Sequence, residues 1–201
     1  SSISKILSSV MSVVRVIISV VDSLSTVYLC HDRLEETRAT QQRQLEIFRA
    51  MNDEQRIATS LINLGATLIK MNKFEEARGV LQESLVLKER LHGVDSKDVV
   101  ITLNGLTDAQ HQLGQLEEAL ATSDRALRIM ETHFYEEDPS LYSGVLARNA
   151  EVLLLIGGEA NLNRATNQVN QAIAIEIQQF GAAHPSSTNL LARIEEKQRR
   201  K

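Results

Sequence analysis

The feature that most constrains the fold of this chain is an internal repeat of about 42 residues. The segment FEEARGVLQESLVLKE, residues 74–89, is followed 42 residues later by LEEALATSDRALRIME, residues 116–131. The Glu-Glu-Ala triplet at 75–77 recurs at 117–119, and the leucine at 85 recurs at 127. A repeat of this length is typical of proteins built from stacked copies of one small unit, each of which buries its apolar face against the next.

Each copy is predicted to contain two amphipathic helices, because its apolar residues recur at spacings of three and four. The first helix of the best copy carries Leu61, Leu64, Leu68 and Met71. The second helix carries Phe74, Ala77, Leu81, Leu85 and Leu91. Asn72-Lys73 interrupts the pattern between them, and Gly93 follows the second helix, where a helix C-terminus favours glycine. In the next copy, Gly114 supplies the turn.

Two less regular copies extend the repeat in both directions. LEETRATQQRQLEIFRAM, residues 34–51, matches a second helix, which places a first helix over residues 3–28. A third copy opens at Asp138-Pro139 and turns at Gly157-Gly158, and we expect its three additional residues to form a longer loop at 158–164. The sequence thus predicts nine helices in one all-α domain, residues 1–201, with units at about 3–52, 53–93, 95–135 and 138–183. A capping helix at 187–199 closes the stack with Leu190, Leu191 and Ile194.

The N-terminal stretch SSVMSVVRVIISVVDS, residues 8–23, admits three interpretations. Its apolar residues fall at helical spacings, with the serines on the opposite side. A membrane span needs about 20 mostly apolar residues, and Arg15 and Asp22 interrupt this one. The stretch is therefore a helix buried by the other repeats, a helix that docks on another subunit or a membrane surface, or a retained organelle-targeting segment.

Composition narrows the class of protein and of partner. Hydrophobic residues make up 43% and charged residues 24%, as in folded proteins. The formal net charge of -4 argues against nucleic acid as the main partner. Cys30 is the single cysteine, so no intrachain disulfide can form, which fits a reducing compartment. We expect a cytoplasmic protein, with a mitochondrial or other organellar location as the alternative.

No motif of an active site is present in the sequence. The five histidines form no HExxH pattern, there is no CxxC pair, and GxGxxG, P-loop and GxSxG motifs are absent. The acidic pairs at 35/36, 75/76 and 117/118 recur at one position of the repeat. Acid in the first turn of a helix interacts favourably with the helix dipole, so we assign these pairs to structure. We expect no catalysis, no cofactor and no metal.

The residues of the best copy resemble the tetratricopeptide repeat, whose first helix carries W-x-x-L-G-x-x-Y and whose second carries a small residue followed by a large one. Leu61, Leu64, Gly65 and Leu68, followed by Ala77 and Leu81, match that spacing. The resemblance covers roughly residues 15–186. The chain departs from it at Thr107, Gln110 and Asn149. The long period, with the segment GAAHP at 181–185, is similar to the long-repeat subclass typified by kinesin light chains.

The resemblance implies a right-handed α-solenoid whose first helices line a concave groove that binds peptides or helices of other proteins. In kinesin light chains, asparagines beside a core leucine of the first helix contact the ligand backbone. The groove positions that the resemblance implies here are Asn63, Lys70, Asn104, Asp108, His111, Arg148 and Glu151. An amide offers both a donor and an acceptor, so it can bind a peptide backbone whatever its side chains are.

These observations predict a non-catalytic scaffold that binds other proteins, with a peptide or helix as ligand and no nucleic acid. The alternative is a permanent structural subunit of a large assembly, docked through its outer faces and its N-terminal helix. Membrane contact through that helix is a lesser possibility, and a regulatory module cut from a longer enzyme is the third interpretation.

Overall fold

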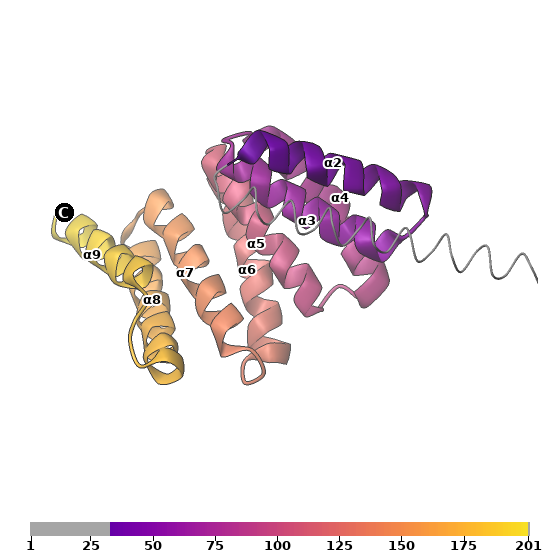
Figure 1. Ribbon diagram of the computed structural model, residues 1–201. Coiled ribbons are helices and arrows are strands. Elements are labelled where there is room, and N and C mark those ends of the chain that lie inside the picture. Colours follow the sequence, from indigo (N-terminus) through magenta and orange to yellow (C-terminus); the bar gives the residue numbers. More distant parts are fainter. Residues whose placement is uncertain (1–32, 201) are drawn as a thin grey trace, which may run out of the picture. The chain divides into compact units, whose positions relative to one another are not determined.

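The computed structural model describes residues 33–200, which belong to two compact units divided after residue 84, within one helix. Every regular element in residues 33–200 is a helix, which confirms the all-α prediction (Figure 1). The helices are α2 (Leu34–Ala50), α3 (Glu54–Lys70), α4 (Phe74–His92), α5 (Lys97–Gln112), α6 (Leu116–Ile129), the π-helical segment η1 (Met130–Phe134), α7 (Pro139–Ile156), α8 (Glu159–Phe180) and α9 (Pro185–Arg199). The predicted first helix and Cys30 lie outside the described residues.

The turns between helices form where the sequence places residues that tolerate a left-handed backbone. Asn72 has a φ of 58° and Gly114 has a φ of 74°. In each case the next residue donates its N–H back into the preceding helix: Lys73 to Leu68 at 2.8 Å and Gln115 to Gln110 at 3.0 Å. This pattern satisfies carbonyl groups that the end of a helix would otherwise leave unpaired, so the predicted breaks at these two positions are confirmed.

Helix α7 begins as the Asp138-Pro139 pair predicts. The Asp138 side chain accepts a hydrogen bond from the backbone N–H of Leu141 at 3.0 Å, and proline occupies the first turn. Proline fits there because its missing N–H has no partner within the helix. The start of α9 is similar, with Pro185 in the first turn and His184 before it, so the capping helix begins two residues earlier than predicted.

We expect Asp138→Ala to lower the free energy of unfolding by about 1 kcal/mol, because it removes the side-chain cap of α7. Asp138→Asn keeps an oxygen that can accept the same hydrogen bond, so its loss should be no more than a few tenths of that value. Urea unfolding of the two variants and the parent chain measures the difference. Equal losses for alanine and asparagine would contradict the capping role.

The unit that ends at Ser84 is held by a close approach between α3 and the first part of α4. Leu61, Leu64 and Leu68 from α3 and Ala77 and Leu81 from α4 are all buried. A Cβ atom built on Gly65 would lie 2.6 Å from Leu81 Cγ, closer than any normal contact. Gly65 therefore allows this pair of helices to pack, as the repeat pattern predicts.

The unit that begins at Leu85 has α7 at its centre. Helix α7 packs against α5 and α6 on one side and against α8 and α9 on the other (Figure 1). Leu103, Leu127 and Leu146 belong to one buried cluster, and Leu153 and Ile194 belong to a second. Leu190 and Ile194 are buried while Leu191 is half-buried, which matches the predicted role of α9 as a cap.

The predicted loop at 158–164 is wrong, because α8 begins at Glu159 directly after a turn of two glycines. Leu162 is 1% exposed and lies in the same cluster as Ala165 and Val169, which continue its helical spacing. The Asn161 side chain also donates to the carbonyl of Gly157 at 2.8 Å. The three additional residues extend the helix by almost one turn, because burial of Leu162 favours helix over loop.

The second helices of this unit end in two different ways. Gly93 and Gly181 follow α4 and α8 with φ values of 85° and 77°. Helix α6 has no glycine at its end; the chain widens into the π-helical η1, and Tyr135 follows with a φ of -49°. Since a tyrosine rarely adopts positive φ, the chain continues as a wider helix where glycine would have ended it.

Asn149, which replaces a core leucine of the repeat pattern, is fully buried in α7. Its Nδ2 donates to Ser123 Oγ at 2.8 Å and to Asp124 Oδ1 at 2.7 Å, both on α6. Thr107, the other main departure, is buried too, and its hydroxyl donates to the carbonyl of Leu103 at 2.9 Å. The Asn149 Nδ2 group and the Thr107 hydroxyl are therefore accommodated by hydrogen bonds, as buried polar groups require. The Asn149 Oδ1 atom has no hydrogen-bond partner within residues 33–200.

Candidate functional site

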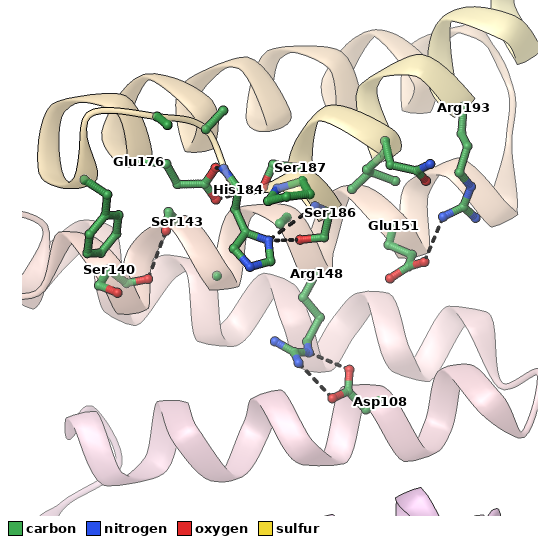
Figure 2. A pocket seen from close by; sticks show the side chains of 18 residues that line it. Asp108, Ser140, Ser143, Arg148, Glu151, Glu176, His184, Ser186, Ser187 and Arg193 are labelled. Atoms are coloured by element: carbon green, nitrogen blue, oxygen red, sulfur yellow. Dashed lines mark hydrogen bonds and ion pairs between the residues drawn. The ribbon is translucent and has the colours of Figure 1, made fainter.

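The candidate site is a cavity in the second unit, on the side where α5, α7 and α9 follow one another. Its volume is about 660 Å³. The cavity, called here the α7–α9 cavity, is lined by residues of α5, α7 and α9, by the end of α8 and by the loop 181–184 (Figure 2). These helices are the first helices of consecutive repeats, which the resemblance predicts to form the binding face.

Two ion pairs connect the helices across this face. Arg148 Nε and Nη2 donate to the two carboxylate oxygens of Asp108 at 2.5 and 2.8 Å, which joins α7 to α5. Arg193 Nη1 donates to Glu151 at 3.2 Å, which joins α9 to α7 (Figure 2). Burial opposes the charge of Arg148, but the hydrogen bonds and charge of Asp108 outweigh it and raise the pKa of the guanidinium above its ordinary value. The guanidinium of Arg148 therefore stays charged, and its two hydrogen bonds to Asp108 fix its position.

The loop 181–184 is fastened to α8 by one buried carboxylate. Glu176 is 7% exposed, and it accepts hydrogen bonds from the backbone N–H of His184 and from Ser187 Oγ, both at 2.7 Å. The His184 ring contacts Ser186 Oγ through Nδ1 at 2.6 Å, beside the cavity (Figure 2). A buried charge needs such partners, so Glu176 fixes one wall of the cavity.

The structure brings three of the seven predicted groove residues together. Asp108, Arg148 and Glu151 all line the α7–α9 cavity. Asn104 and His111, which lie on α5, are half-buried and do not line it. Asn63 and Lys70 are exposed on α3, in the other unit.

The assignment of Asn104 as an equivalent of Asn63 is not supported by the repeat register. Counted from Leu64 and Leu106, the residue that corresponds to Asn63 is Gly105, one position later. The Asn104 Oδ1 atom is enclosed and has no hydrogen-bond partner within residues 33–200. An offset of one residue rotates a helical side chain by about 100°, so Asn104 turns partly toward the packed interior.

Sequence reasoning missed the residues that the α8–α9 connection adds to the cavity. These are chiefly Glu176, Phe180, His184, Ser186 and Arg193. The GAAHP segment marked the end of a unit, but no pattern indicated that it returns toward α7. One sequence pattern could have indicated Arg193. Asp108 is followed by an arginine 40 residues later, at 148, and Glu151 is followed by one 42 residues later, at 193. Such spacing, close to the repeat length, places opposite charges side by side on neighbouring first helices.

The described part of the chain shows neither a metal site nor a membrane-spanning helix. Residues 33–200 contain no cluster of three or more metal-binding side chains. None of the helices searched there combines the length and the hydropathy needed to span a bilayer.

Comparison with known proteins gives matches for the family and the fold. The family model described as Tetratricopeptide repeat matches residues 18–90 and 56–132, which together make up more than half of the chain. No curated protein matches the chain in sequence.

Three solved structures illustrate the likeness in fold. A Podosopora anserina protein assigned as a kinesin light chain, with nearly identical TPR-like repeats, has a TM-score of 0.73 at 17% identity over 91% of this chain and 87% of its own. BtubC (BKLC) from P. vanneervenii has a TM-score of 0.71 at 24% identity, over 84% of this chain and 66% of its own. The MamA RS-1 ArsTM double mutant has a TM-score of 0.54 at 11% identity, over 91% of this chain and 95% of its own.

At these sequence identities, the structural similarity establishes the fold of this chain but does not identify a ligand. The helix pairs and the family match agree with the prediction made from Leu61, Leu64, Gly65 and Leu68. The kinesin-light-chain-like form of the repeat is likewise confirmed by the structural neighbours. The chain therefore belongs to the tetratricopeptide repeat family.

Proposed function

We propose that this protein is a non-catalytic scaffold that binds a segment of a partner protein on the face formed by α5, α7 and α9. The observation that carries the proposal is the α7–α9 cavity of about 660 Å³, on the face where the repeat register places ligand-binding positions. A cavity of this size accommodates a few residues of a peptide. Asp108, Arg148 and Glu151, predicted from the sequence, line it.

Rigidity of this face supports the proposal. The two ion pairs connect α5 to α7 and α7 to α9, and Glu176 holds the loop that closes one side. A preformed surface loses little conformational freedom when a ligand binds. Membership of the tetratricopeptide family supports a role in protein–protein interaction in general terms.

The proposal is tested by blocking the cavity and comparing the partners retained. Ser140 and Asn189 are exposed side chains that line it. Ser140→Arg with Asn189→Arg should reduce the recovery of bound proteins several-fold when the full chain is used as bait in a cell extract. Quantitative mass spectrometry of the captured proteins gives the measurement.

A charge-matched control lies on α8. Asn167 and Asn170 are exposed and do not line the cavity, so Asn167→Arg with Asn170→Arg should leave recovery unchanged. The reverse result, loss with the α8 pair and none with the cavity pair, would contradict the proposal. It would favour instead a permanent subunit that docks through its outer helices.

A further inference from the structure

The charges that line the α7–α9 cavity are all partnered within the chain. Arg148 pairs with Asp108, and Arg193 pairs with Glu151. Glu176 is bonded to the backbone of His184 and to Ser187. A charged ligand group would compete with these internal partners for the same donors and acceptors, so it would gain less than it would from an unpaired side chain of opposite charge. The electrostatics of the cavity therefore complement a ligand that carries no charge.

The loop at one side of the cavity presents backbone groups that are free to bind. Within residues 33–200, no hydrogen bond engages the backbone N–H groups of Ala182 and Ala183, and both residues line the cavity. An extended peptide can bind to these groups, because each of its residues carries an N–H and a C=O that are not paired within the peptide. Backbone pairing of this kind is a common way to bind an extended segment.

Helix α7 leaves room for such a segment at Gly144. A Cβ atom built on Gly144 meets nothing within 4 Å, although the residue lines the cavity. Packing within residues 33–200 therefore does not explain this glycine, unlike Gly65, whose Cβ would collide with Leu81. At the corresponding position of α5 the chain has Ile101, which is 44% exposed. A glycine at this place lets the backbone of a ligand approach α7 closely.

An exposed aromatic ring completes the cavity. Phe180, at the end of α8, is 68% exposed and belongs to the lining. Burying a ring of this size against an apolar side chain of a ligand is favourable, roughly in proportion to the area removed from water.

We propose that the α7–α9 cavity binds an extended, uncharged peptide segment of a partner protein. The peptide backbone pairs with Ala182 and Ala183 and passes over Gly144, and an apolar side chain of the segment packs on Phe180. This proposal rests on the proposed scaffold function and specifies the chemistry of its ligand.

The test selects random peptides displayed on phage against the full chain and sequences those that are enriched. We expect them to share a short uncharged core with at least one apolar residue. Fluorescently labelled copies of the enriched peptides are then titrated with Gly144→Leu and Phe180→Ala variants. Each substitution should weaken binding by about tenfold or more, measured by fluorescence anisotropy.

Gly79 supplies a matched control for Gly144. It also lies inside a helix and has no atom within 4 Å of a built Cβ, but it is exposed on α4 and outside the cavity. Gly79→Leu should change peptide affinity by less than about twofold. Both leucine variants should keep or raise the thermal midpoint, because leucine is the better helix former.

The other outcomes separate this inference from the proposed function. Enriched peptides whose charged residues are essential, and which bind Gly144→Leu as well as the parent chain, would overturn the uncharged ligand and leave the scaffold function intact. Failure to enrich any peptide on the full chain would overturn both.

Discussion

Replacing Gly65 with leucine is expected to lower the free energy of unfolding by about 3 kcal/mol, at the upper end of the usual effect of overpacking. The Cβ atom alone would lie 2.6 Å from Leu81 Cγ and 2.8 Å from Leu81 Cδ2. Leu81 is 1% exposed, so relieving this contact requires the buried side chain to move or α3 and α4 to separate. For a chain of this length, the loss corresponds to a decrease of roughly 6–12 °C in the thermal midpoint.

Gly79→Leu is the control for this prediction as well. Gly79 lies in the same unit and inside a helix, but its Cβ would meet no atom of residues 33–200 within 4 Å. Thermal and urea unfolding of both variants give the comparison. Adding Leu81→Ala to Gly65→Leu should recover part of the loss, since it removes the atoms that collide. Equal stability of the two glycine variants would contradict the close-approach role of Gly65.

The helices could be predicted from the sequence because their apolar residues recur with the period of a helix over several turns. Residues such as Leu61, Leu64 and Leu68 must face one side, and that side is the buried one. The turns could be predicted for a similar reason, since glycine, asparagine or proline marks each of them. Local chemistry therefore determines most of the secondary structure.

Two features of the fold were not predicted from the sequence, and they have different causes. The segment after Gly158 is helical because Leu162 reaches a cluster formed with α9, which lies far along the chain. The end of α6 widens into η1 where the sequence provides no glycine. The first feature depends on tertiary neighbours, since the residues after Gly158 look compatible with a loop until the burial of Leu162 is known. The second follows from the local backbone preference of Tyr135.

The candidate site could be predicted only in part. The repeat register identified Asp108, Arg148 and Glu151, because first helices of neighbouring repeats present equivalent positions on one face. Register errors of one residue are enough to misplace a side chain, as Asn104 shows. The wall built from Glu176 and the loop 181–184 depends on a hydrogen bond across eight residues, which no periodic pattern encodes.

Glu176→Ala is expected to lower the free energy of unfolding by about 3 kcal/mol and to loosen the loop at 181–184. The substitution removes two hydrogen bonds to a carboxylate and leaves the His184 N–H and the buried Ser187 hydroxyl without their partner. Loosening this wall should also weaken binding of the selected peptides, since Ala182 and Ala183 would no longer be held in place. Urea unfolding and amide hydrogen exchange at 182–187 measure the two effects.

Two further variants make the role of Glu176 specific. Glu176→Gln keeps one oxygen that can accept a hydrogen bond, so its loss should be about half that of alanine. Glu196→Ala removes an exposed carboxylate that pairs with Arg200 four residues later, and should cost less than about 1 kcal/mol. If Glu176→Ala were as stable as Glu196→Ala and exchange in the loop were unchanged, Glu176 would not be the group that fixes this wall. If Glu176→Ala is destabilising as expected, the glutamine variant separates the loss of charge from the loss of hydrogen bonds, because it removes the charge entirely and the hydrogen bonds only in part.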